Sequence, residues 1–265
     1  MSTFRSQDIP DLQDQVIIVT GGNVGLGYET IRQLSEHNPA RIYLAARSRD
    51  KAEQAIADLK QANPQFTNIR FLELDLVLFA SVKSAAAEFL SRESRLDILV
   101  NNAGIMMTPE GLTKDGYEIQ FGTNVLGPAL FTQLLLPTLR KTAKENNAQA
   151  RMVMLSSAAH ARAPSDVYKF DELRTTASHR HTTERYTTSK LVNLHYARAL
   201  AKRETDAKIV PVHPGMVATN LHHASTGTFL RFFLYAGIFL AATPVDKGAL
   251  SQIFAAVSPE AKHGQ

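Results

Sequence analysis

The sequence contains no cysteine among its 265 residues. This absence excludes disulfide bonds and thiolate metal sites, and with them a small secreted scaffold held together by disulfides. The sequence also lacks a long run of one charge, because its 29 basic and 25 acidic side chains are scattered and leave a net charge of +4. Nucleic-acid binding is therefore weakly supported, and the modest positive balance suits an anionic small molecule at least as well.

Long apolar runs are scarce as well. The longest strongly apolar stretch, residues 229–242, is interrupted by Arg231 and is too short to span a bilayer. Residues 1–10 are polar and mixed in charge, without the apolar core of a secretory signal. We therefore expect a cytoplasmic protein with no integral membrane span.

What the sequence does contain is an alternation of short β-branched runs with amphipathic segments of helical length. Continuous apolar strands that alternate with helices predict a parallel sheet covered on both faces. The expected strands are 16–20, 41–46, 69–74, 96–101, 152–156 and 209–213, and the expected helices are 25–37, 49–61, 79–91, 117–141, 186–203 and 245–256. We predict a single doubly wound α/β domain of the Rossmann type over residues 1–265, with six to seven parallel strands.

Two segments interrupt this alternation. Residues 158–185 are polar, basic and rich in histidine, whereas residues 216–243 are apolar and aromatic. Both follow the carboxyl ends of expected strands, where ligands bind in parallel sheets, so both are candidate walls of a substrate site. For residues 216–243, a helix packed on the sheet or a contact between subunits is an equally good interpretation.

A glycine-rich turn follows the first expected strand, in the order Thr20-Gly21-Gly22-Asn23-Val24-Gly25-Leu26-Gly27. Glycine permits a tight turn and a close approach of the backbone to a ligand, and the free N–H groups at the next helix start attract an anion. A plain loop could share this spacing of glycines. The strand before the turn and the helix after it favour a phosphate-binding turn in a dinucleotide site.

The end of the second expected strand bears on the choice of dinucleotide. Arg47 and Ser48 stand here, about where an acidic residue contacts the ribose of NAD or an arginine contacts the 2′-phosphate of NADP. A guanidinium matches a phosphate and a serine adds a hydroxyl, so NADP(H) is the predicted cofactor. The alternative is that Arg47 and Arg49 simply face solvent.

Tyr186 and Lys190 stand four positions apart at the start of an expected helix, so their side chains share one face. An ammonium about 4 Å from a phenol contributes roughly 4 kcal/mol at an effective dielectric of 20, enough to lower a tyrosine pKa from about 10 to near 7. The pair is thus a candidate acid or base at neutral pH. The same spacing also arises by chance on surface helices, so its meaning depends on the motifs around it.

Taken together, these motifs resemble the short-chain dehydrogenase/reductase family, closest to its retinol-dehydrogenase-like and WW-domain-oxidoreductase-like branch. The resemblance covers residues 14 to about 258. It includes the glycine turn, Asp75, Asn101-Asn102-Ala103-Gly104, Asn124, Ser157, Tyr186 with Lys190, and the loop from His213 to Thr219. The family usually adds a seventh strand after the last helix, where this sequence has only residues 258–265.

The resemblance implies hydride transfer between a nicotinamide and a carbonyl carbon. The implied catalytic residues are Asn124, Ser157, Tyr186 and Lys190, and the implied substrate contacts are Met107, Met216, Ser157 and Tyr186. The implied cofactor contacts are Gly21, Asn23, Gly25, Leu26, Gly27, Arg47, Ser48, Asp75, Leu76, Asn102, Ala103, Gly104, Tyr186, Lys190, Pro214, Gly215, Val217 and Thr219. Tyr186 would exchange a proton with the substrate oxygen, which Ser157 would hold, and Lys190 would lower the tyrosine pKa and bind the nicotinamide ribose.

The expected substrate is a bulky, lipophilic ketone, aldehyde or secondary alcohol, because methionine and aromatic residues crowd the candidate walls. The spacing of the nine histidines supports no metal site. A homodimer or homotetramer is compatible with the resemblance. The alternative function is a protein of the same fold that binds the dinucleotide but serves non-redox chemistry, sensing or scaffolding.

Overall fold

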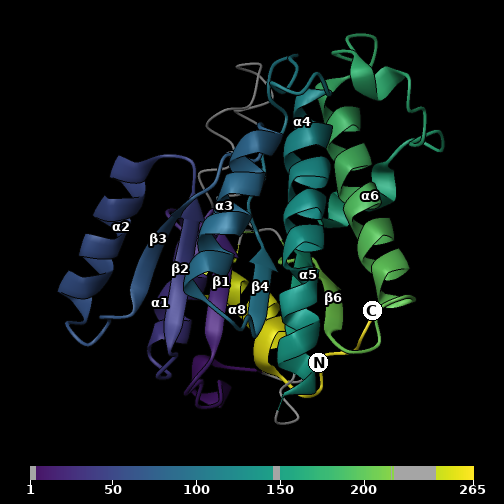
Figure 1. Ribbon diagram of the computed structural model, residues 1–265. Helices are drawn as coiled ribbons and strands as arrows, with labels where there is room; N and C mark the ends of the chain where they lie inside the picture. The colour runs from purple at the N-terminus through teal and green to yellow at the C-terminus, as the bar shows by residue number, and fades with distance from the viewer. Residues whose placement is uncertain (1–3, 146–149, 216, 218–242) are drawn as a thin grey trace.

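The structure is a computed structural model that describes residues 4–145, 150–215, 217 and 243–265 (Figure 1). Six parallel strands form one sheet in the order β3-β2-β1-β4-β5-β6. The strands are β1 (Val16–Thr20), β2 (Arg41–Ala46), β3 (Ile69–Glu73), β4 (Ile98–Asn101), β5 (Arg151–Leu155) and β6 (Lys208–Val212). The prediction of a doubly wound α/β fold is therefore confirmed, and the order reverses between β1 and β4.

Helices cover both faces of the sheet, as Figure 1 shows. The long helices are α1 (Gly25–Ser35), α2 (Arg49–Ala62), α3 (Phe79–Arg92), α5 (Gly127–Lys144), α6 (Thr182–Ala201) and α8 (Val245–Val257). One buried cluster joins the sheet to α3, α5 and α6, and a second joins it to α1, α2 and α8. Phe89 and Phe131 are fully buried in the first cluster, where truncating either to alanine would cost about 3–5 kcal/mol.

The central strands are apolar on both sides because both of their faces are covered. Every residue of β1 is buried, and Val19 lies between Leu44 of β2 and Val100 of β4. This arrangement explains why these strands are continuous apolar runs without a polar alternation. The predicted strand starts at 96 and 152 differ from the observed starts at Ile98 and Arg151 by one or two residues.

The expected helix over residues 117–141 is broken into three parts. A short helix α4 (Ile119–Phe121) leads into a π-helical turn η2 (Gly122–Leu126), and α5 then continues to Lys144. A π turn contains one extra residue and often marks a functional site. Apolar periodicity does not reveal it, because the extra residue is accommodated by contacts with other elements.

Helix α6, which carries the candidate pair Tyr186 and Lys190, begins at Thr182, four residues before the predicted start at Tyr186. The side chain of His181 caps it by accepting a hydrogen bond from the N–H of Thr183 at 3.3 Å. This first turn precedes the apolar positions of the helix, which is why the hydrophobic pattern misses it. Tyr186 therefore lies in the second turn of a helix that is already established.

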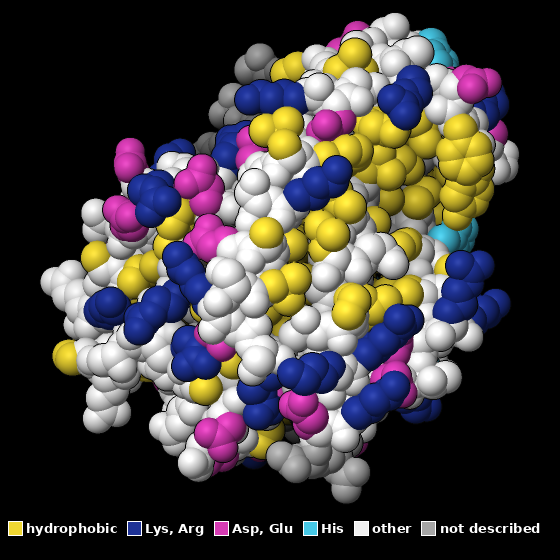
Figure 2. All heavy atoms as spheres, viewed as in Figure 1, with side chains coloured by type: hydrophobic (Ala, Val, Ile, Leu, Met, Phe, Trp, Pro, Cys, Tyr) yellow, Lys and Arg dark blue, Asp and Glu magenta, His cyan; other side chains and the backbone are white. Residues whose placement is uncertain are grey.

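Residues 158–181 contain two short 3-10 helices, η3 (Ala158–Arg162) and η4 (Glu172–Arg174). Val167 of this segment joins Phe121, Val125 and Val192 in a small buried cluster, which we call the satellite cluster. Figure 2 shows apolar side chains gathered over α6 and the neighbouring segment, where Tyr168 and Phe170 are 48% and 68% exposed. The prediction that residues 158–185 line a substrate site stays a prediction.

Of the second candidate wall, residues 216–243, the structure describes Val217 and Thr243, and Met216 and Thr219 lie outside the described residues. Among the helices that the structure describes, none is both long enough and apolar enough to cross a membrane. Within the same residues, no three histidine, aspartate or glutamate side chains come together as metal ligands.

Candidate active site

The glycine turn closes tightly between β1 and α1. Gly21 and Gly25 have φ values of +66° and +56°, in the left-handed region that favours glycine. A Cβ at Gly27 would lie 2.3 Å from the carbonyl oxygen of Gly21, so only glycine fits there. Helix α1 begins at Gly25 without a side-chain cap, which leaves its first N–H groups available to an anion. Asn23 and Leu26 are half-buried in the same turn.

Two hydrogen bonds tie the start of this turn to the end of β4. The side-chain amide of Asn102 donates to the carbonyl oxygen of Thr20 at 2.8 Å, and the N–H of Ala103 donates to the Thr20 hydroxyl at 2.9 Å. Gly104 follows, and a Cβ there would lie 3.1 Å from Asn124 Oδ1 and 3.5 Å from Lys190 Nζ. The structure thus brings the fourth-strand motif, the glycine turn and the candidate pair of Tyr186 and Lys190 to one edge of the sheet.

The two arginines after β2 differ in their surroundings. Arg49 lies within 3.3 Å of Glu73 and 3.4 Å of Glu53, and its guanidinium lies 4.8 Å from the centre of the Phe71 ring. Arg47 is exposed, and none of the residues that the structure describes forms a hydrogen bond or ion pair with it. Ser48 is the half-buried N-cap residue of α2, and its hydroxyl makes no capping bond. Arg47 is therefore the cation here that is available to a ligand.

The turn after β3 is held close to α5. The Asp75 carboxylate accepts a hydrogen bond from the N–H of Val77 at 3.2 Å, and Leu76 is buried. A Cβ at Gly127 would lie 2.6 Å from the carbonyl oxygen of Leu76, so a glycine is required where α5 begins.

The loop after β6 and the segment after Gly104 approach the same edge. Gly215 has a φ of +85°, and its N–H donates to Nδ1 of His213 at 3.0 Å, with Pro214 half-buried between them. Val217 is buried and forms a bridge to Thr243. Met107 has a φ of +51°, is half-buried, and its N–H donates to Gln120 at 2.8 Å.

Tyr186 and Lys190 are both buried on α6, with exposures of 5% and 6%. Ser157, directly after β5, lies beside the Tyr186 hydroxyl and interacts with it. Ser156 is also buried, but its hydroxyl donates to the carbonyl oxygen of Lys190 at 2.7 Å. The two adjacent serines therefore serve different partners, and Ser157 is the one beside the phenol.

The pKa shifts of Tyr186 and Lys190 differ from those that their spacing in the sequence predicted. Burial raises the pKa of Tyr186, and the Ser157 hydrogen bond opposes that rise. Burial also lowers the pKa of Lys190 to about 8. Lys190 Nζ lies 5.8 Å from the centre of the Tyr186 ring and donates to the Leu155 carbonyl at 3.3 Å. Desolvation is thus the largest cause of both pKa shifts, rather than the mutual stabilisation that the spacing of the two groups suggested.

Asn124 lies in the π turn and its side chain is fully engaged. Its amide donates to the carbonyl oxygen of Ile105 at 2.9 Å and to the Ser189 hydroxyl at 3.0 Å, and its oxygen accepts from the N–H of Ile105 at 2.8 Å. The Ser189 hydroxyl in turn donates to the Tyr186 carbonyl at 2.7 Å. Asn124 therefore joins the segment after β4 to the turn of α6 that contains Tyr186 and Lys190.

Sequence reasoning missed Ser189 and Gln120 as parts of this site. Gln120 is fully buried, accepts from Met107, and donates to Thr182 at the start of α6. The position of Ser189 between Tyr186 and Lys190 was a signal that could have identified it. For Gln120, no local pattern distinguishes it from a surface glutamine, because its partners lie far away in the sequence.

The comparisons with known proteins agree with this geometry. A family model described as short chain dehydrogenase matches residues 15–168. An uncharacterized oxidoreductase of Schizosaccharomyces pombe is 42% identical over 258 residues, which cover 96% of this chain and 75% of that protein. Human polyprenol dehydrogenase is 35% identical over 262 residues, which cover 97% of this chain and 77% of that protein.

A solved structure matches as well. NADPH-bound carbonyl reductase from chicken fatty liver superimposes with a TM-score of 0.65 at 25% identity, over 89% of this chain and 88% of that one. The chain belongs to the short-chain dehydrogenase family. It is a dinucleotide-dependent oxidoreductase, and the predicted family resemblance is confirmed. The predictions of a cytoplasmic location and of a homodimer or homotetramer stay predictions.

Proposed function

We propose that this protein is an NADP(H)-dependent oxidoreductase that interconverts a carbonyl and a secondary alcohol, and that it favours reduction of a bulky, lipophilic ketone or aldehyde. The observation that carries the proposal is the burial of Tyr186 and Lys190 together on α6, with Lys190 Nζ 5.8 Å from the centre of the Tyr186 ring and Ser157 beside the phenol. These groups stand at the same sheet edge as the glycine turn, where ligands bind in doubly wound folds.

The residues of the chain have separate tasks in this proposal. Ser157 holds the substrate oxygen by its hydroxyl, and Tyr186 gives that oxygen a proton during reduction or takes it during oxidation. The raised pKa of Tyr186 keeps the phenol protonated at neutral pH, which suits its role as the acid of a reduction. Lys190, with its pKa lowered to about 8, supplies a positive charge below that pH and would contact the nicotinamide ribose.

The geometry of the glycine turn and its neighbours fits a bound dinucleotide. Gly21 and Gly27 form a cradle that a side chain would fill, and the uncapped start of α1 would hold the diphosphate. Asp75 and Leu76 would contact the adenine, and Gly104 would admit the nicotinamide half. When bound, the cofactor supplies the hydride in reduction and accepts it in oxidation.

The preference for NADP(H) rests on the surroundings of Arg47. Its guanidinium has no partner among the described residues, whereas Arg49 is held by two glutamates. An arginine fork suits a ribose 2′-phosphate, and no acidic residue at the end of β2 is present to bind a ribose 2′-hydroxyl. The chicken carbonyl reductase whose structure contains NADPH supports the same choice.

The lipophilic substrate is inferred from the residues near the catalytic pair and from a relative. Met107 is half-buried at the end of the segment that follows Gly104, and Met106 beside it is buried. The human relative is named for a polyprenol, a long lipophilic alcohol. An apolar wall would exclude water from the reacting carbonyl and favour an apolar substrate.

The proposal is tested by following NADPH absorbance at 340 nm with paired ketones, aldehydes and alcohols of increasing lipophilicity. We expect turnover with NADPH, and kcat/KM that rises with the apolar surface of the substrate. Equal activity on small polar carbonyls would refute the lipophilic site. Tight NADPH binding without turnover of any substrate would favour a sensor, scaffold or non-redox enzyme.

A further inference from the structure

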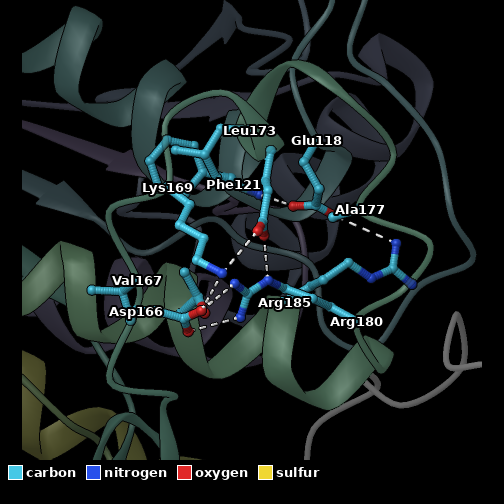
Figure 3. Close-up of a pocket in the computed structure, with 11 residues that line it drawn as sticks. Glu118, Phe121, Asp166, Val167, Lys169, Leu173, Ala177, Arg180 and Arg185 are labelled. Atoms are coloured by element: carbon cyan, nitrogen blue, oxygen red, sulfur yellow. Dashed lines mark hydrogen bonds and ion pairs between the residues drawn. The ribbon is translucent and has the colours of Figure 1, made fainter.

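A buried ion pair joins the residue that precedes α4 to the turn of α6 that leads to Tyr186. Glu118 is 2% exposed and Arg185 is 5% exposed, and Arg185 Nη1 lies 3.5 Å from Glu118 Oε1. Figure 3 shows both side chains at a small pocket that Phe121, Val167 and Leu173 also line. Arg185 directly precedes Tyr186 in the sequence, so its position is coupled to that of the phenol.

Glu118 also stabilises α4, the short helix that leads to Asn124. Its second carboxylate oxygen, Oε2, accepts a hydrogen bond from the N–H of Phe121 at 2.7 Å and so caps α4. Helix α4 runs without a break into the π turn that contains Asn124. A carboxylate at a helix start is favourable because it satisfies free N–H groups and faces the positive end of the helix dipole. One side chain therefore controls where the π turn begins.

Both residues of the pair also form hydrogen bonds with the segment that follows β5. Arg185 Nη1 donates to the carbonyl oxygen of Thr176 at 3.3 Å, and the N–H of Glu118 donates to the carbonyl oxygen of Leu173 at 2.9 Å. At the same pocket, Arg180 lies 2.9 Å from Asp166 and 2.5 Å from Glu172, and these ion pairs join the two ends of the segment. Residues 166–180 thus form a loop that is stabilised by its own ion pairs and contacts Glu118 and Arg185.

The pair is poorly suited to adding stability. Burial raises the pKa of Glu118 because it disfavours the charged carboxylate, and the backbone hydrogen bonds and Arg185 oppose that rise. Arg185 Nε has no hydrogen-bond partner among the residues described, and the contact between the two charges is long. Buried ion pairs are often no better for stability than apolar residues of the same volume, so a geometric role is the better explanation.

We propose that Glu118 and Arg185 are positioning residues that hold the π turn of Asn124 against the helix of Tyr186 and Lys190. This inference rests on the proposed function, because the geometry that it protects is that of the proton-transferring phenol. The pair acts through the backbone of α4 and α6 and touches neither substrate nor cofactor. Its loss would let the two elements shift without unfolding either one.

The test is the double variant Glu118→Gln with Arg185→Met. Glutamine keeps an oxygen for the cap at Phe121, and methionine fills most of the arginine volume, so no unpaired charge is left buried. We expect kcat to fall about ten- to a hundredfold, because small displacements of reacting groups cost that much, while KM for NADPH stays within about twofold. Hydrogen exchange should become faster in residues 119–126 and 182–190.

A control ion pair is available at the other end of α6. Arg140 of α5 lies 2.6 Å from Glu204, which stands three residues after the end of α6; Glu204 is almost fully buried, whereas Arg140 is half-exposed. The double variant Arg140→Met with Glu204→Gln removes an ion pair that also involves the α6 region but lies far from Tyr186, and we expect it to keep the wild-type kcat. The conservative change Arg185→Lys retains the charge with a shorter reach, and it should lose less kcat than the double variant.

The outcomes are distinct. Wild-type kcat in the Glu118/Arg185 double variant would overturn the positioning role, and so would an equal loss in the control. A loss of kcat that follows only the fraction of unfolded protein would also overturn it. If the wild type turned over no substrate at all, the proposed function would fail instead, and the exchange measurement would still decide whether the pair holds α4 against α6.

Discussion

Arg47 offers the sharpest test of cofactor choice. It is exposed at the end of β2 and has no partner among the described residues, while Arg49, two positions on, lies within hydrogen-bonding reach of Glu53 and Glu73. If Arg47 binds the 2′-phosphate, replacing it should weaken NADPH binding and leave NADH binding nearly unchanged. Arg49 provides the matched control, because its charge is already engaged.

The magnitude follows from the strength of a charge-assisted hydrogen bond. Such a bond contributes about 1.5–3 kcal/mol, which corresponds to about 10- to 150-fold in a dissociation constant. Exposure of Arg47 lets salt screen its charge, so we expect the lower part of this range for Arg47→Ala. Arg47→Asp should have a larger effect, because it adds repulsion of the 2′-phosphate and offers an acceptor for the ribose hydroxyl of NADH.

The assay is the ratio of kcat/KM with NADPH to that with NADH, measured at low and at high salt. We expect the ratio to fall about tenfold in Arg47→Ala, to fall further in Arg47→Asp, and to change less than about threefold in Arg49→Ala. The wild-type ratio should also fall with added salt, whereas the ratio of Arg47→Ala should respond little. An unchanged ratio in both Arg47 variants, or a larger effect at Arg49, would refute the 2′-phosphate role.

Three further predictions concern the catalytic groups. Tyr186→Phe should lower kcat about 10²- to 10⁴-fold and leave NADPH binding intact by fluorescence titration; retained turnover would exclude the phenol as the proton donor. Ser157→Ala should lower kcat, whereas Ser156→Ala should mainly lower the melting temperature, since its hydroxyl bonds the Lys190 carbonyl; the reverse pattern would exchange their roles. Lys190→Met should gain stability relative to wild type at neutral pH. Because the folded pKa is about 8 and the unfolded value is 10.5, the wild type recovers stability as the pH rises between them. Urea unfolding at about pH 7 and about pH 10 checks this, and a stability difference independent of pH would contradict it.

Much of the fold was predictable because the sheet is buried on both faces. The runs that became β1 and β2 are continuous and apolar, and their predicted bounds match the observed ones. The glycine turn was equally clear, since Gly21 and Gly25 adopt left-handed φ values that favour glycine, and Gly27 has no room for a Cβ. Signals of this kind are local, so they can be read without knowing what lies nearby.

The rest depended on contacts between distant segments. The π turn at Gly122–Leu126 interrupts an otherwise regular helical pattern, and the bonds of Asn124 to Ile105 and Ser189 cross between separate elements. The pKa of Tyr186 was expected to fall beside Lys190, but both groups are buried deeply enough for desolvation to dominate. Spacing along a helix gives the neighbour of a side chain but not the amount of water around it.

The satellite cluster has a consequence for the way the enzyme responds to heat. Its members Phe121, Val125, Val167 and Val192 form a cluster distinct from the two that hold the sheet. A small separate cluster can open in a local transition that leaves the rest of the domain folded. Such an opening would release the start of α6 and the π turn together. Activity is therefore expected to disappear, reversibly, at a temperature below that of global unfolding.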